Sequence, residues 1–396
     1  MRLRSLFTMH PATTAHLSAV AVSMALSLGT PLAQAAAVTW PSQPQAHLDT
    51  LHDRPLTDAQ RQLRQARRAL TEQPTHLPQA LQVAAQALSL AREEGDTRYL
   101  AQAQAALAPW WLQADAPPEV RLVRATVRQA LHDFDAAHAE LHALTQQHPE
   151  HTQAWWTLAT VRQLTGRYAE ARQACDGMQR NGATWQATLC QADLDSFQGR
   201  AQEARQSLSR LMWRAPKALL PHLVLVRAEL AERLGEQQEA AQLYDTLASI
   251  ARDPYSEGAL ADWLLDQGQA QTVWARLQGR TRHDGLLLRL AEAATVLKHP
   301  QAPALARQMG ERLAAARHRG DSIHWREEAR FELRVRKRPQ EALRLALVNW
   351  GIQKEPIDAR LVLEAARAAG RPDAARAVID FCRQAGWTDV RLGVRT

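Results

Sequence analysis

A small residue recurs five positions after a glycine along most of this chain. The pairs are Gly166 and Ala171, Gly199 and Ala204, Gly235 and Ala240, and Gly370 and Ala375, with His132 and Ala137 in the same frame. Positions 132, 166, 199, 235 and 268 are 34, 33, 36 and 33 residues apart, and Gly370 follows 102 residues later, which equals three units of 34. A fixed period of this length is typical of a solenoid, in which each unit buries its apolar face only against its neighbours.

Apolar residues with helical spacing alternate with short breaks at Gly, Pro, Asn or Asp from Thr57 to about residue 385. No stretch has the alternating, β-branched pattern of a strand. We therefore expect an all-α solenoid over residues 57–386 that starts with a helix capped by Thr57. Its repeats are clearest over 118–250 and degenerate over 254–320, where Lys298 and Pro303 interrupt the frame, and a C-terminal tail follows over 387–396.

The clearest unit runs from residue 152 to about 180. Trp155, Leu158 and Ala159 share one helical face, Gly166 breaks the helix, and Ala171 begins the buried face of a second helix. The small residues would let the two helices approach closely. The unit is therefore expected to be a helical hairpin.

At these residues the chain resembles the tetratricopeptide repeat, whose pattern is W-x2-L-G-x2-Y, then A-x3-F, then P. Trp155, Leu158 and Ala171 match this pattern in type and spacing, while Ala159 replaces Gly and Cys175 replaces Phe. The resemblance implies a right-handed solenoid of helical hairpins. It also implies a binding function, with the first helix of each hairpin facing a concave groove.

The start of the chain has the pattern of a secretory signal. Arg2 and Arg4 precede an apolar stretch over residues 17–28 and a small-x-small cleavage site at residues 33–35. An uncleaved membrane anchor is the alternative. We expect a signal peptide over 1–35, a proline-containing flexible tether over 36–56, and an exported, periplasmic protein with no transmembrane helix after signal removal.

The chain is basic, and nearly all of its positive charge comes from arginine. Removing residues 1–35 takes away two arginines and no acids, so the formal charge falls from +7 to +5. Arginine favours planar contacts with carboxylate and phosphate groups. The densest basic run, residues 334–338, follows several glutamates and is expected to be a solvated helix face, so nucleic acid is not an expected partner.

The local motifs of nucleotide, metalloprotease, serine hydrolase and redox sites are absent from the sequence. His138 and His142 are one helical turn apart, but they are expected on an outer, solvated helix face. The sequence therefore predicts a protein without catalysis, cofactor or functional metal site. It would act as a scaffold or adaptor of the cell envelope for an unknown protein partner, or alternatively as an accessory factor that holds anionic envelope polymers through its arginines.

One stripe on the first helices is predicted to line the concave groove, beginning with Trp156, which lies about 100° around its helix from Trp155. The stripe consists of Leu122, Thr126 and Gln129, then Trp156, Thr160 and Gln163, then Leu189, Asp193 and Ser196. Such a mixed apolar and amide-rich surface suits an extended peptide or a helix. A second interpretation stays open for Trp156, which could instead pack against the next repeat.

Cys175 and Cys190 lie at nearly equal distances on either side of the break at Asn181 and Gly182. In an antiparallel hairpin such residues come opposite each other, so the two sulfurs can meet in one seam. An oxidising compartment would favour a disulfide between them. The alternative is a pair of small buried thiols, and Cys382 is unpaired in both cases.

Overall fold

The computed structural model describes residues 55–214, 216–319 and 324–393, and these form helices and turns without a strand. The first helix, α1 (Asp58–Glu72), begins after Thr57, whose hydroxyl accepts a hydrogen bond from the backbone N–H of Gln60. The expected signal peptide and residues 36–54 of the expected tether lie outside the described residues.

Helices α2 to α12 form five hairpins, each of which turns between its first and second helix. They are α2 (Leu77–Glu94) with α3 (Arg98–Ala106), α5 (Pro118–Ala130) with α6 (Phe134–Gln147), α7 (Thr152–Leu164) with α8 (Tyr168–Arg180), α9 (Thr184–Asp195) with α10 (Ala201–Arg214), and α11 (Leu220–Leu234) with α12 (Gln237–Ile250). The short helices α4 (Ala108–Trp111) and η1 (Lys217–Leu219) connect successive hairpins.

Four further hairpins complete the described part of the chain. They are α13 (Pro254–Asp266) with α14 (Ala270–Leu277), α15 (Asp284–Val296) with α16 (Ala302–His318), α17 (Trp325–Arg334) with α18 (Pro339–Ile352), and α19 (Pro356–Ala368) with η2 (Pro372–Ala375) and α20 (Arg376–Gln384), followed by η3 (Val390–Leu392). The architecture is the expected all-α solenoid of helical hairpins.

The turn of each hairpin contains a residue with positive φ, which glycine adopts at the lowest cost. His132 occupies this position with φ 59°, as the sequence frame predicts. The prediction that Lys298 interrupts the frame is wrong, because Lys298 is itself a turn residue with φ 51°, and Lys337 is the next with φ 57°. Pro303 lies in the first turn of α16, where a proline is tolerated.

Small buried residues let the two helices of a hairpin pack closely. Ala171 is fully buried in the same hydrophobic cluster as Trp155 and Leu158. Gly177 on α8 faces Trp155 so closely that an added Cβ would lie 2.7 Å from the indole ring. The size of these residues therefore sets how near α7 and α8 can lie.

We expect Ala171→Leu to lower the free energy of unfolding by about 1–3 kcal/mol, because the larger side chain overpacks a filled interface. Denaturant unfolding would measure the change. Ala169→Leu is the matched control, since Ala169 lies on the same helix and is exposed. Equal stability of the two variants would contradict this packing.

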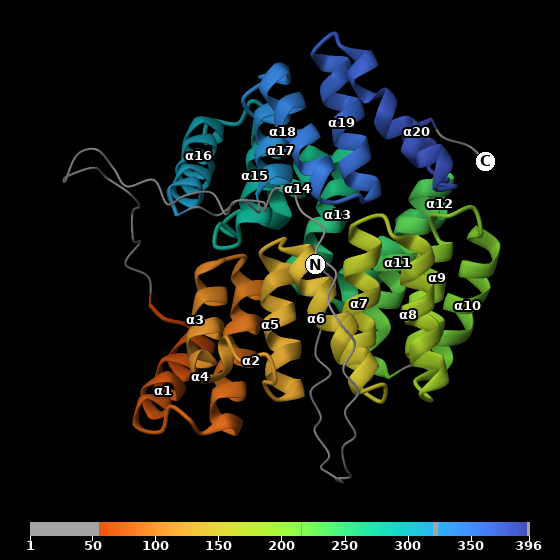
Figure 1. Cartoon of the computed structure of the whole chain (residues 1–396). Coiled ribbons are helices and arrows are strands. Elements are labelled where there is room, and N and C mark those ends of the chain that lie inside the picture. The colour runs from red at the N-terminus through yellow and green to blue at the C-terminus, as the bar shows by residue number, and fades with distance from the viewer. Residues whose placement is uncertain (1–54, 215, 320–323, 394–396) are drawn as a thin grey trace, which may run out of the picture.

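The C-terminal hairpins lie on the turns of the N-terminal hairpins. In Figure 1, α17 to α20 lie above α5 to α9, so the superhelix closes onto itself. The backbone N–H of Lys354 donates to Leu164 O at 2.7 Å, and the hydroxyl of Tyr168 donates to Lys354 O at 3.2 Å. One hydrophobic cluster includes residues of both α7 and α19. The two superhelical turns therefore share a core.

Residues 387–393, which were expected to belong to a tail, are part of this closure. Trp387 is buried, and the backbone N–H of Thr388 donates to Phe197 O at 2.9 Å. The guanidinium of Arg391 pairs with Glu232 on α11 at 3.4 Å. Through these contacts, residues 387–393 pack the C-terminal end of the solenoid against its middle hairpins.

Candidate functional site

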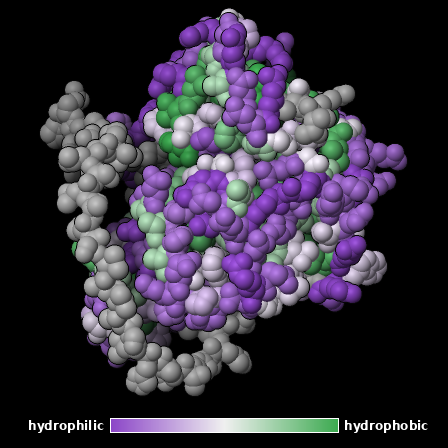
Figure 2. Space-filling model, turned by 45° about the vertical axis from the view of Figure 1, so that its right-hand side comes forward, coloured by the Kyte–Doolittle hydropathy of each residue, from purple (hydrophilic) through white to green (hydrophobic). Residues whose placement is uncertain are grey.

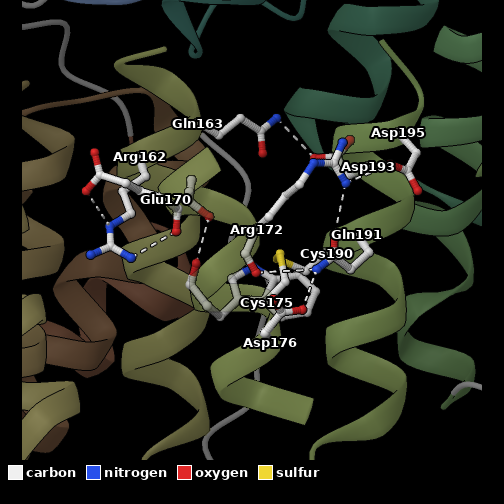
Figure 3. Close-up of a disulfide and its surroundings, with 12 residues drawn as sticks. Arg162, Gln163, Glu170, Arg172, Cys175, Asp176, Cys190, Gln191, Asp193 and Asp195 are labelled. Carbon is white, nitrogen blue, oxygen red and sulfur yellow. Dashed lines mark hydrogen bonds and ion pairs between the residues drawn. A yellow bond between two sulfur atoms is a disulfide. The ribbon is translucent and has the colours of Figure 1, made fainter. Parts of the chain in front are cut away.

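A small pocket lies between α7 and α9 on the inner side of the first helices. It is lined by five of the nine predicted groove residues, namely Trp156, Thr160, Gln163, Leu189 and Asp193, and its volume is about 30 Å³. His222 of α11 and Glu355, which precedes α19, complete the lining together with Ala159, Leu164 and Cys190. The side-chain amide of Gln163 donates to Asp193 at 3.2 Å (Figure 3).

The other four predicted groove residues do not line this pocket. Leu122 and Gln129 are buried on α5, and the hydroxyl of the half-buried Thr126 donates to Leu122 O at 2.8 Å. Ser196 is buried at the end of α9, where its hydroxyl oxygen accepts a hydrogen bond from Arg233 at 2.8 Å. The curvature of the solenoid packs these parts of the stripe against neighbouring hairpins.

Trp156 combines the two roles that the sequence left open. Part of its surface lines the pocket, and the residue is half-buried against two hydrophobic clusters, one of which includes Leu189 and Leu223. Its removal would therefore disturb packing as well as the pocket. Thr160 and Gln163 are better positions for changing the pocket alone.

The inner side of the last four hairpins is filled by an ion-pair network. Arg330 on α17 pairs with Asp262 on α13 at 2.6 Å and with Glu292 on α15 at 2.5 Å. Arg360 on α19 pairs with Asp266 on α13, which joins the first and last of these hairpins. Arg289, Arg334 and Glu364 extend the network.

Burial opposes ionisation of Asp262, but Arg289 and Arg330 outweigh it and hold the pKa of this carboxyl below its ordinary value. Burial likewise opposes the charge of Arg330, yet Asp262 and Glu292 raise the pKa of its guanidinium. Asp262 and Arg330 are therefore both charged at neutral pH, and their ion pair is part of a larger network. It occupies the side of α13, α15, α17 and α19 that corresponds to the groove on α7 and α9.

In the structure, Cys175 on α8 and Cys190 on α9 form a disulfide bridge with a Cα–Cα distance of 5.7 Å (Figure 3). Arg172 supports the same seam by donating to Gln191 at 3.0 Å and to Asp195 at 2.7 Å. Because Cys190 also lines the pocket, the bridge fixes one of its walls. Cys382 is a buried free thiol, and burial is the main cause that raises its pKa to about 12.

We expect reduction of the bridge to lower the free energy of unfolding by about 3 kcal/mol, the chain-entropy value for a closed loop of about 15 residues. Urea unfolding with and without a reductant would measure the difference. The double variant Cys175→Ala/Cys190→Ala should have the same free energy of unfolding in both conditions. Peptide mapping without reduction tests the bridge directly. Free thiols at both positions in protein from an oxidising compartment would contradict it.

His138 and His142 lie side by side with ring centroids 5.9 Å apart. The Nε2 atom of His138 accepts a hydrogen bond from the guanidinium of Arg162 at 3.3 Å, which places a positive charge where a metal would bind. Within the described ranges, no three His, Cys, Asp or Glu residues are grouped to hold a metal ion. No helix in those ranges is long and apolar enough to cross a membrane.

Residues 129–187 match the family model of the tetratricopeptide repeat. This range includes the whole α7/α8 hairpin, in which Trp155, Leu158 and Ala171 occupy the buried positions of the repeat. This segment of the chain is therefore similar to the tetratricopeptide repeat, a repeat of protein-interaction scaffolds.

Two solved structures are similar to this chain over most of their length. The P58(IPK) TPR domain is 15% identical with a TM-score of 0.23, and the match covers 78% of this chain and 95% of that one. The Cut9–Hcn1 hetero-tetramer of the APC/C is 14% identical with a TM-score of 0.28, and the match covers 83% of this chain and 87% of that one. No curated protein matches the chain.

Proposed function

We propose that this protein is a non-catalytic adaptor of the cell envelope that binds an extended segment or a helix of a partner protein on the inner face of α7, α9 and α11. The observation that carries the proposal is the pocket where Trp156, Leu189 and the Gln163–Asp193 pair meet. An aromatic and aliphatic wall beside fixed amide and carboxylate groups suits a peptide, which offers both apolar side chains and backbone hydrogen bonds.

The closure of the solenoid supports this location for the partner. On the last four hairpins the inner side chains are engaged in the ion-pair network around Arg330, whereas on α7 and α9 they line a pocket. A partner would therefore approach the first superhelical turn. Glu355, from the second turn, lies beside the same pocket and would contact a bound segment.

The envelope location rests on the pattern of residues 1–35, which is that of an export signal. The bridge between Cys175 and Cys190 supports it, since disulfides persist in oxidising compartments.

Thr160→Arg is the variant that tests the pocket, because it places a long charged side chain there while leaving Trp156 and the clusters intact. We expect it to weaken capture of the partner about tenfold or more, as the loss of an interface anchor does. Pull-downs from envelope extracts with wild type and variant would measure this. Thr246→Arg is the matched control, because Thr246 is exposed on α12 and its hydroxyl makes the same bond to the carbonyl four residues earlier as Thr160 does.

The dependence of binding on salt concentration distinguishes this proposal from the alternative, an accessory factor that binds anionic polymers. Binding through several arginines weakens steeply as ionic strength rises, whereas apolar binding in the pocket does not. Capture that disappears with added salt and is equal for Thr160→Arg and Thr246→Arg would favour the polymer-binding function over the proposed one.

A further inference from the structure

A second surface of interest lies at the end of α10. On the face shown in Figure 2, hydrophilic residues cover most of the surface and hydrophobic residues gather in small separate groups. Among the described residues, Leu112 and Trp213 are the most exposed large hydrophobic side chains, at 93% and 91%. An indole so exposed is covered by almost nothing in its own chain.

Three basic residues surround Trp213. Arg210 and Arg214 lie three residues before it and one residue after it on α10, so all three share one side of the helix, and Lys217 follows in η1. All three basic side chains are exposed, and none pairs with a carboxylate in the part of the chain that the structure describes. Elsewhere, arginines such as Arg330 are neutralised by acidic neighbours.

The fold itself does not account for this arrangement. A basic residue in the last turn of a helix interacts favourably with the helix dipole, which explains a charge at Arg214. The dipole gives no reason for an exposed indole, and like charges four residues apart on a helix repel each other. An exposed tryptophan among unpaired cations is instead the chemistry of the interface between water and an anionic lipid membrane.

The position of Trp213 favours a lipid surface over a peptide or a sugar. Its indole projects from the solenoid, whereas small ligands are held in concave sites. Leu112, which follows α4, lies on the same edge of the solenoid, opposite the hairpin turns and three hairpins before Trp213. A broad, deformable surface can contact both residues without a matching pocket.

We propose that this edge docks on membranes that contain anionic phospholipids, with the Trp213 ring at the headgroup level and Arg210, Arg214 and Lys217 on lipid phosphates. The opposite edge is covered by the C-terminal hairpins, as the hydrogen bond from Lys354 to Leu164 shows. The proposal does not depend on what the pocket on α7 and α9 binds.

The test is cosedimentation of the full chain with vesicles made of equal parts phosphatidylglycerol and phosphatidylcholine, compared with vesicles of phosphatidylcholine alone. We expect binding only to the anionic vesicles. Trp213→Ala should weaken it about tenfold or more, because a large apolar side chain is no longer buried. Arg210→Gln/Arg214→Gln should weaken it by at least as much, since each basic residue near an anionic membrane contributes about fivefold and two together more than about tenfold.

Arg64→Gln/Arg68→Gln is the matched control, because it removes two exposed arginines with the same spacing from α1. This control should bind like wild type, and circular dichroism should be the same for all variants.

Equal losses of vesicle binding for the two arginine pairs would overturn the proposal in favour of attraction by net charge. Binding that soluble glycerol phosphate abolishes, or failure of wild type to bind anionic vesicles, would also overturn it. If vesicles do not bind and Trp213→Ala instead loses a protein from pull-downs, the edge docks on a protein.

Discussion

Trp387→Ala should lower the free energy of unfolding by about 3–5 kcal/mol, the usual cost of removing a large aromatic side chain from a core. Trp387 is 1% exposed, although it lies outside the last long helix. Its ring contacts four aromatic rings from both superhelical turns, with centroids 5.9–6.2 Å apart: Tyr168, Phe197, Trp350 and Phe381. The substitution should therefore loosen the closure of the solenoid.

Trp213→Ala is the matched control for stability, because it makes the same substitution at a residue that is 91% exposed. Denaturant unfolding and small-angle scattering would measure the two effects. Only Trp387→Ala should shift the unfolding midpoint and enlarge the native particle. If both variants unfold at the same midpoint, residues 387–393 are not part of the folded core.

Arg330→Met should also be strongly destabilising, by about 3–5 kcal/mol, because it leaves buried carboxylates without their main partner. The guanidinium of Arg330 lies within 2.6 Å of Asp262 and 2.5 Å of Glu292, and all three side chains are largely buried. Methionine fills similar volume but carries no charge. Within the described residues, Arg289 pairs with Asp262 alone, and Arg334 lies 3.7 Å from Glu292, so neither can join the two carboxylates as Arg330 does.

Arg376→Met is the control for this variant. Arg376 pairs with Asp373, and both side chains are largely exposed. Such surface ion pairs contribute about 0–1 kcal/mol to the free energy of unfolding, so the control should unfold almost like wild type. Unfolding in urea would compare the two variants. Similar stability of Arg330→Met and wild type would mean that the network does not hold the four C-terminal hairpins together.

The hairpins could be predicted from the sequence because their signals are local. A turn residue, a small residue five positions later and apolar residues three and four apart define each unit, and His132 fits because the left-handed conformation is allowed, though unfavourable, for residues other than glycine. For the same reason, two turns could not be recognised in the sequence. Lys298 and Lys337 adopt positive φ without any sequence signal, so the sequence alone shows three missing units but not their boundaries.

The closure could not be predicted, because it depends on contacts between residues far apart in sequence. Tyr168 bonds Lys354 across 186 positions, and no repeat pattern encodes such a pair. The groove was predictable only where helical spacing decides it, as at Thr160 and Gln163. Ser196 lies on the predicted stripe but is buried by Arg233, since the curvature of the solenoid decides which inner residues stay accessible.

Photo-crosslinking at position 160 tests the central claim most directly, that a partner protein binds on the inner face of α7 and α9. A benzophenone amino acid would replace Thr160 in one sample and the exposed Thr246 in another, in cells that make the full chain. We predict a discrete crosslinked protein from position 160 that mass spectrometry identifies, that is absent from position 246, and that is lost when Gln163→Arg is added. The same products from both positions, or products unaffected by Gln163→Arg, would contradict binding in the pocket.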